Sequence, residues 1–235
     1  MFSRFLGNNP WYIFIRTTRS FCAKNFCDRR QYEYILPVYA LEPFDKEHPV
    51  CSIAEDIQQF WDSSDEKSQE TAQILTQYSF TYSPDAQDVT FGGIIPSEEW
   101  PSFLPTALNR LRACMSMFVG THNFHNYTVG KSPMDPSSRR HLLSIVVSDP
   151  IRIQDELYLR IRLEGQSFML HQIRKMIGMS VETARGHCTF YKVYCSMSTG
   201  KTITPLAPST GLFLDKVWIN CSVYSSLFLV IITRR

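Results

Sequence analysis

Arg174 is the residue whose type and position most clearly suggest chemistry. It lies in residues 165–187, GQSFMLHQIRKMIGMSVETARGH, where apolar residues recur at helical spacing. Leu170, Ile177 and Gly178 stand one turn away on the same surface, so the guanidinium leaves the helix beside apolar side chains. Two interpretations stay open. The arginine either lies along the edge of a core with its charge in water, or points into a cleft to hold an anion.

Two histidines three residues apart, His122 and His125 in GTHNFHNYTVGK, suggest a metal site. Zinc requires further Cys, His or carboxylate ligands at a recognisable spacing, and the neighbouring sequence offers none. We therefore expect no metal, and we expect side-chain hydrogen bonds around a turn that Phe124 and Tyr127 anchor. Stoichiometric zinc in the purified protein would revive the alternative of a metal-dependent hydrolase.

A third group of residues mixes charge with aromatic rings. In CDRRQYEY, Asp28, Arg29 and Arg30 immediately precede Tyr32. Such a mixture is typical of surfaces that bind RNA, where bases stack on rings and cations meet phosphates. A strand whose charged end is simply solvated would give the same pattern, and these residues alone do not separate the two interpretations.

Composition bounds the class of protein but does not choose the function. The chain has 235 residues, of which 44% are hydrophobic and 13% aromatic, and this usage predicts a globular protein with a sizeable core. The net charge of +2 is too small to indicate a polyanionic partner by itself. Seven cysteines lie scattered without a CxxC pair, which argues against a disulfide framework and favours a reducing compartment.

The ends of the chain carry their own signals. The longest apolar run, residues 227–232, is far shorter than the roughly 18 residues that a membrane-spanning helix requires, so no membrane association is expected. The first 27 residues contain no acidic residue and carry basic, aromatic and hydroxyl side chains, the bias of a mitochondrial presequence. Residues 11–15 fit a first strand equally well.

The elements that must position these residues alternate between strand and helix patterns. Within residues 11–41, Tyr32, Tyr34 and Leu36 fall on one face of a strand that Pro37 ends. Residues 42–100 accumulate acidic side chains and predict an insertion or linker outside any nucleic-acid path. Residues 104–118 show helical spacing up to Gly120, which we expect as the C-cap.

The second half of the chain predicts strand, strand and helix. Residues 142–147 form an apolar run that should be a buried strand, and LYLRIRL at residues 157–163 alternates strictly. Ser167 is the expected N-cap of the helix that carries Arg174. The order of elements predicts an α+β fold with a mostly antiparallel sheet covered by helices on one face. No repeat, phosphate-binding glycine loop, serine elbow or paired metal motif is present in the sequence.

Four of these stretches resemble one family. CDRR with YEYILPVYAL, GTHNFHNYT, DPSSRRHLLSIVVSDP and GQSFMLHQIRKMIG together resemble the tRNA pseudouridine synthases of the TruA family, in particular the eukaryotic branch. PLAPSTGLFLD, residues 205–215, resembles the closing strand of the family. The resemblance implies a TruA-like fold that is incomplete at its N-terminus. It divides the chain into residues 1–41, a remnant of the N-terminal catalytic subdomain; 42–100, the acidic insertion; 101–217, the C-terminal catalytic subdomain; and 218–235, an atypical tail.

The resemblance implies a cofactor-free isomerisation of uridine in structured RNA, with tRNA as the partner. The base must be flipped out of its stack, because its reacting atoms are inaccessible inside a helix. By motif, Arg174 pairs with a nucleophilic aspartate and Tyr32 stacks in the pocket, which Phe168 and Leu170 line. The residues expected to contact RNA are Arg30, His122, Asn123, His125 and Arg139. Nucleus and mitochondrion both suit the family, and the oligomeric state is left open.

The sequence departs from the family at the aspartate. The RTDxGV motif that carries it lies well upstream of the CDxRxYEY strand in the family and is absent from these residues. RTTRS, residues 16–20, holds Thr18 in the corresponding place, but it lies too close to Asp28 and matches instead the R-x-T-x-x-F run before that strand. Asp28 belongs to the strand entrance and is no substitute. The expectation is therefore a fragment that begins inside the catalytic domain and forms no pseudouridine as written; the alternative is a non-catalytic RNA-binding remnant or degenerate paralogue.

Overall fold

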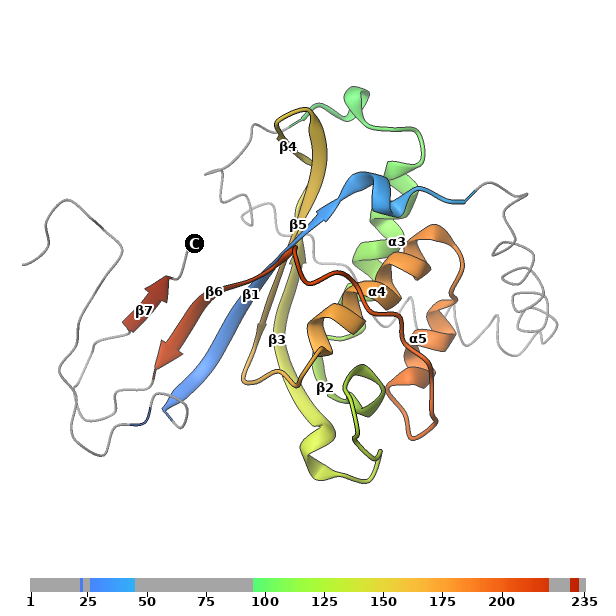
Figure 1. Cartoon of the computed structure of the whole chain (residues 1–235). Coiled ribbons are helices and arrows are strands. Elements are labelled where there is room, and N and C mark those ends of the chain that lie inside the picture. The colour runs from blue at the N-terminus through green and yellow to red at the C-terminus, as the bar shows by residue number, and fades with distance from the viewer. Residues whose placement is uncertain (1–21, 23–25, 45–94, 220–228, 233–235) are drawn as a thin grey trace, which may run out of the picture.

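A computed structural model describes residue 22 and residues 26–44, 95–219 and 229–232 (Figure 1). The predicted presequence, the alternative first strand at residues 11–15 and the RTTRS run lie outside these ranges, as do most of the acidic segment and most of the tail.

An antiparallel sheet forms one side of the described structure. Its strands are β1 (Cys27–Pro37), β2 (Gly120–Asn123), β3 (Arg139–Val147), β4 (Ile151–Ile153), β5 (Glu156–Gly165), β6 (Leu212–Ile219) and β7 (Leu229–Ile232). The described strands follow the order β2-β3-β5-β1-β6-β7, with β4 paired to β5, and every pairing between them is antiparallel. β1 thus lies in the middle of the sheet, between two strands that come much later in the sequence.

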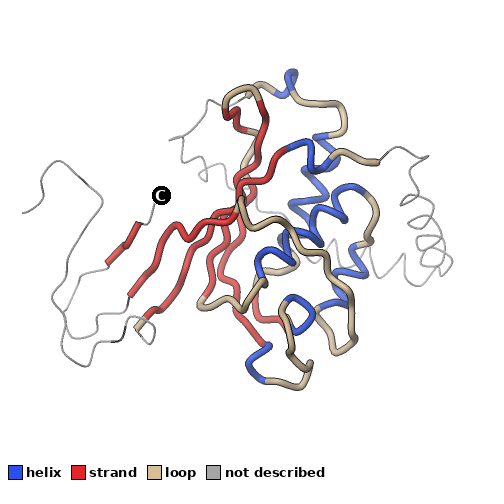
Figure 2. Tube along the Cα trace, viewed as in Figure 1, coloured by secondary structure: helices blue, strands red, loops and turns tan. Residues whose placement is uncertain are grey.

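Helices cover one face of this sheet. They are α3 (Leu104–Ser116), α4 (Gln172–Arg185) and α5 (Phe190–Ser196), together with the short 3-10 turns η1 (Val38–Leu41), η3 (Ser97–Glu99), η4 (His125–Tyr127) and η5 (Pro136–Ser138). Figure 2 shows the strands gathered on one side and the helices on the other. The predicted α+β fold with an antiparallel sheet covered on one face is confirmed. No helix in the described ranges is long and apolar enough to cross a membrane.

The core lies between the sheet and helices α3 and α4. Alternate residues of β1, namely Tyr34 and Leu36, face it together with Ile161 and Leu163 of β5, because side chains alternate between the two faces of a strand. α3 contributes Leu108, Leu111 and Met115 and α4 contributes Ile173, Met176 and Ile177, all buried. The helical periodicity of both segments in the sequence therefore corresponds to one buried stripe on each helix.

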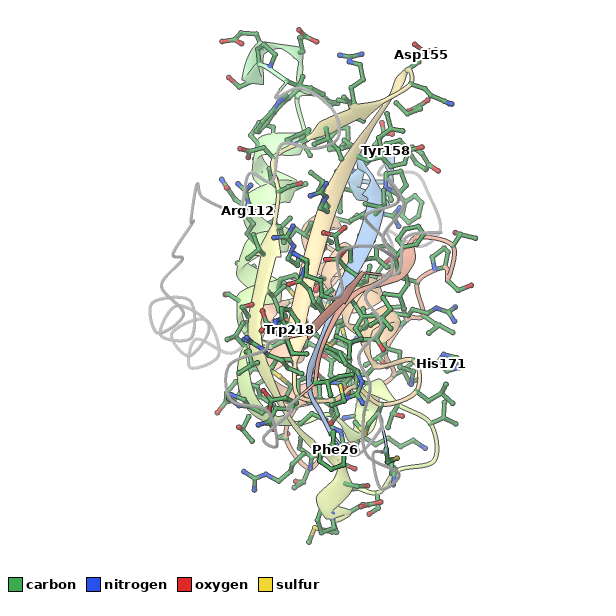
Figure 3. The ribbon with its side chains drawn as sticks, turned by 90° about the vertical axis from the view of Figure 1, so that its left-hand side faces the viewer. Phe26, Arg112, Asp155, Tyr158, His171 and Trp218 are labelled. Carbon is green, nitrogen blue, oxygen red and sulfur yellow. The ribbon has the colours of Figure 1, made fainter. Side chains whose placement is uncertain are left out.

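The opposite face of the sheet is polar and ion-paired. Arg29 donates to Glu164 across β1 and β5 at 2.7 Å and lies over the ring of Trp218 on β6, 4.4 Å from its centroid. Arg162 pairs with Glu33 at 3.3 Å. Figure 3 looks onto this face, on which Trp218 lies. Arg29 is thus held within the sheet by an ion pair and a ring contact.

Two predicted helix boundaries and one predicted burial pattern are wrong. Gly120 is not the C-cap of α3: the helix ends at Ser116, three successive N–H groups after it bond to carbonyls three residues back, and Gly120, with φ +101°, opens β2. Ser167 is not the N-cap of α4, which begins at Gln172 after His171 in the left-handed region. Residues 142–147 are not uniformly buried, because β3 starts at Arg139 and only Leu142 and Val147 within it are fully buried.

Burial makes one cysteine inert. Cys114 of α3 accepts a hydrogen bond from Ser180 of α4 at 3.2 Å, and burial raises the pKa of its thiol to about 12. Because the thiolate is the reactive form, we expect iodoacetamide at pH 8 to leave Cys114 unmodified in the folded protein. Exposed Cys22 should be alkylated under the same conditions. Peptide mass spectrometry with and without urea checks this, and equal labelling of the two thiols in the native protein would contradict it.

Candidate active site

The elements around Arg174 come from distant parts of the sequence. β5 runs into the turn at residues 166–171, which leads into α4, and β1 lies beside β5 in the sheet. The 201–211 segment follows α5 and runs back past α4 into β6. Arg174 therefore stands where a helix, the central strand and an irregular segment approach one another.

Arg174 is fixed by the 201–211 segment. Its side-chain Nε donates to the carbonyl of Ala207 at 2.7 Å, and the backbone N–H of Ala207 donates to the carbonyl of Arg174 at 3.1 Å. Its Nη1 lies 3.5 Å from Nδ1 of His171. Within the described part of the chain, the guanidinium of Arg174 makes no ion pair, and its Nη2 has no hydrogen-bond partner. The group is thus oriented by the backbone, with its terminal nitrogens available to a ligand.

Tyr34 lies within the electrostatic influence of Arg174. It is buried, and its hydroxyl donates to the carbonyl of Pro208 at 3.0 Å. Burial raises the pKa of Tyr34, and the positive charge of Arg174 opposes that rise. The neighbouring carbonyls of Ala207 and Pro208 therefore hold the arginine and the tyrosine side by side.

Tyr32 and Phe168 form an aromatic pair beside this arrangement. Their rings meet edge to face with centroids 5.2 Å apart. Gly165 permits the contact, because a Cβ there would lie 3.0 Å from Cζ of Phe168. Burial raises the pKa of Tyr32, against the nearby charge of Arg30. Tyr32 is only partly buried, which leaves part of it open to a planar ligand.

The turn between β5 and α4 is anchored on both sides. Arg30 of β1 donates from Nη1 to the carbonyl of Gln166 at 2.9 Å, and the hydroxyl of Thr128 donates to the carbonyl of Leu170 at 3.0 Å. The side chain of Leu170 is 67% exposed, so in this structure it faces solvent and does not close a pocket wall. Its assignment as a pocket residue stays a prediction.

The remaining residues predicted to contact RNA lie in and beside the turn at η4. His122 bonds through Nε2 to the carbonyl of Val119 at 2.8 Å, and Asn123 donates to the carbonyl of Pro133 at 2.8 Å and contacts Nδ1 of His125 at 3.2 Å. Arg139 is exposed at the start of β3. The predicted turn with side-chain hydrogen bonds, anchored by fully buried Phe124 and Tyr127, is confirmed; RNA contact by these residues stays a prediction.

The residues described here contain no group of three His, Cys, Asp or Glu side chains that could hold a metal ion. The sequence analysis assigned no role in the site to three residues around Arg174: Tyr34, Ala207 and Gly178. A signal existed for Gly178, because glycine in the interior of a helix costs about 1 kcal/mol relative to alanine and often marks a close contact. No pattern indicated that the carbonyl of Ala207 would reach the arginine.

Comparison with known proteins shows which family these residues match. A family model described as tRNA pseudouridine synthase matches residues 114–217, a range that contains α4 and the 201–211 segment. tRNA pseudouridine synthase 1 of Eremothecium gossypii is 32% identical over 89% of the chain. Residues 114–217 thus match the tRNA pseudouridine synthase family.

Two further members of the tRNA pseudouridine synthase family show the same level of similarity. The Homo sapiens pseudouridylate synthase 1 homolog is 33% identical over 86% of the chain, and the tRNA pseudouridine(27/28) synthase of Saccharomyces cerevisiae is 33% identical over 84% of it. The chain covers 45% of the Eremothecium gossypii relative, 36% of the human relative and 56% of the Saccharomyces cerevisiae relative. It therefore spans between about a third and just over half of their length.

Proposed function

We propose that the protein containing these residues isomerises uridine to pseudouridine in tRNA, and that the described part supplies the arginine-bearing side of a TruA-like active site. In this reaction the bond from C1′ of ribose to N1 of the base breaks, the base turns, and a bond from C1′ to C5 forms. C5 loses its hydrogen as a proton and N1 gains one. Atoms and electrons balance without an oxidant, a reductant or a cofactor.

The oriented guanidinium of Arg174 is the observation that carries the proposal. Its terminal nitrogens match a carboxylate in geometry, and a guanidinium beside a carboxylate keeps that group ionised and fixes its direction. No carboxylate of the described residues forms an ion pair with the Arg174 guanidinium. We therefore assign the nucleophilic aspartate to a part of the protein outside the described residues. Tyr32 and Phe168 receive the flipped base by ring contact.

The surrounding residues support an RNA substrate. Arg30, His122, Asn123, His125 and Arg139 form the proposed contacts to tRNA, and Leu170, exposed in the turn before α4, is proposed to line the substrate pocket. Residues 101–217 act as one catalytic unit, and nucleus or mitochondrion is the proposed compartment.

The proposal is tested with tRNA transcripts that carry tritium at C5 of uridine, because isomerisation releases that hydrogen to water. Release of tritium, with pseudouridine found after nuclease digestion, supports the proposal and overturns the expectation that the chain as printed is inactive. A transcript labelled at C6, which stays bonded to its hydrogen, controls for loss of label. Binding of tRNA without release of tritium favours the RNA-binding alternative. A protein that does not bind tRNA and does not release tritium would refute the proposed function.

A further inference from the structure

The 201–211 segment contacts Arg174 through a reciprocal pair of hydrogen bonds. Ala207 accepts from Nε of Arg174 and donates to its backbone carbonyl, at 2.7 and 3.1 Å. We propose that this segment is a positioning element, which sets the direction of the Arg174 guanidinium and so the side from which a carboxylate is bound. The inference rests on the proposed function, because it concerns the same arginine.

The positions of the hydrogens on the guanidinium decide from which side a carboxylate can bind. A carboxylate can accept a bidentate pair either end-on from Nη1 and Nη2 or side-on from Nε and one Nη. Nε has a single hydrogen, and the carbonyl of Ala207 accepts it. The side-on pair is therefore blocked, and the end-on pair remains. Nη2 has no partner among the described residues, and Nη1 lies 3.5 Å from His171.

Two glycines allow the segment to reach this position. A Cβ at Gly178 of α4 would lie 2.5 Å from the carbonyl oxygen of Pro205 and 3.3 Å from the nitrogen of Ala207. A Cβ at Gly211 would lie 2.5 Å from the carbonyl oxygen of Ile35 on β1. Both obstacles are backbone atoms, which cannot rotate away as a flexible side chain can. Any side chain at either position would push the segment away from the helix or the strand.

The segment is held independently of Arg174 on both sides of Ala207. Before it, the hydroxyl of Thr204 donates to the carbonyl of Asn126 at 2.8 Å. After it, the carbonyl of Pro208 accepts from Tyr34 and the carbonyl of Gly211 accepts from the backbone of Ile35 at 2.8 Å. Lys175, next to Arg174 on the helix, also donates to the carbonyl of Asn126 at 3.1 Å. The carbonyl of Ala207 is thus a fixed acceptor to which the arginine conforms.

A double-mutant cycle separates positioning from general stability. We expect Gly178→Ala to lower kcat for tritium release by about 10²-fold with KM nearly unchanged, since a misplacement of about 1 Å has an effect of that size. In an Arg174→Ala background the same substitution should cause no further loss, because it acts through the arginine. Gly200→Ala is the matched control, since a Cβ there meets nothing within 4 Å. Additive effects of Gly178→Ala and Arg174→Ala, or wild-type kcat for Gly178→Ala, would overturn the inference.

Two further measurements keep the test decisive. If Gly178→Ala does not fold, Thr204→Val serves instead, since it replaces the hydroxyl that holds the segment by a methyl group. It should lower kcat several-fold, and it should have no further effect in the Arg174→Ala background. The NMR signal of the Arg174 Nε–Hε group should exchange slowly with solvent in the wild-type chain and rapidly in Gly178→Ala or Thr204→Val. That readout needs no activity, so a protein that releases no tritium refutes the proposed function alone, whereas rapid exchange in the wild type refutes the positioning role.

Discussion

In a chain that carries the nucleophilic aspartate, replacing Arg174 with alanine should lower tritium release from C5-labelled tRNA by about 10³-fold, because it removes the cation that keeps the carboxylate ionised and fixes its direction. The magnitude follows from the loss of one preorganised charged donor in an active site, which typically costs about 10²–10³-fold or more. Among the described residues, Nη2 of Arg174 has no partner and Nη1 has only Nδ1 of His171 at 3.5 Å, so no ion pair there competes for these nitrogens.

Lysine should not rescue this loss. An ammonium group keeps the charge but has a single nitrogen. It therefore cannot donate to the carbonyl of Ala207 and at the same time offer two parallel N–H groups to a carboxylate. We therefore expect Arg174→Lys to retain tRNA binding within a few-fold while kcat stays at least about 10²-fold below wild type. Arg152→Ala is the control, since Arg152 of β4 forms an exposed pair with Glu99 of η3. A kcat for Arg174→Ala within three-fold of wild type would remove Arg174 from the mechanism.

Asn126→Ala should cause a large loss of stability. The buried amide of Asn126 donates to the carbonyls of Ser196 and Gly200 at 2.9 and 2.8 Å and accepts from the N–H of Thr202 at 3.0 Å. Alanine would leave these three backbone groups without a partner, and each such loss costs about 1 kcal/mol or more. We expect the free energy of unfolding to fall by about 3 kcal/mol.

Urea denaturation followed by circular dichroism measures this change, with the slope of the transition as a check on two-state behaviour. Asn109→Ala is the matched control, because Asn109 is exposed on α3 and alanine favours the helix there. Its free energy of unfolding should stay within about 0.5 kcal/mol of wild type. A comparably small change for Asn126→Ala would show that this side chain does not hold α5 and the 201–211 segment together.

The elements around the site were predictable where hydrophobic periodicity is strong. Strict alternation in β5 and the apolar stripe of α4 each correspond to one buried face, which includes Leu163 in β5 and Met176 in α4. The ends of helices were not predictable, because they depend on contacts made after folding. His171 takes the left-handed conformation before α4, and Gln172 accepts from the N–H of Met169 there, whereas Ser167 looked like the better cap.

The site itself was predictable only in part. The helical position of Arg174 followed from the sequence, and the turn containing His125 and Tyr127 has the predicted side-chain hydrogen bonds. The bond from Arg174 to Ala207 could not be foreseen, because a backbone carbonyl in an irregular segment carries no side-chain signature. The stacking role of Tyr32 stays a prediction.

The order of strands also constrains how the protein is made. β1 pairs with β5 and β6 within the described sheet, and β6 ends only at Ile219. At typical rates of translation the ribosome reaches the end of β6 roughly 10–40 s after it completes β1. The strand that carries both tyrosines must therefore leave the exit tunnel long before its neighbours exist. During synthesis it is a natural target for chaperones that bind extended, aromatic segments, and slower elongation would lengthen the time for which the nascent chain depends on them.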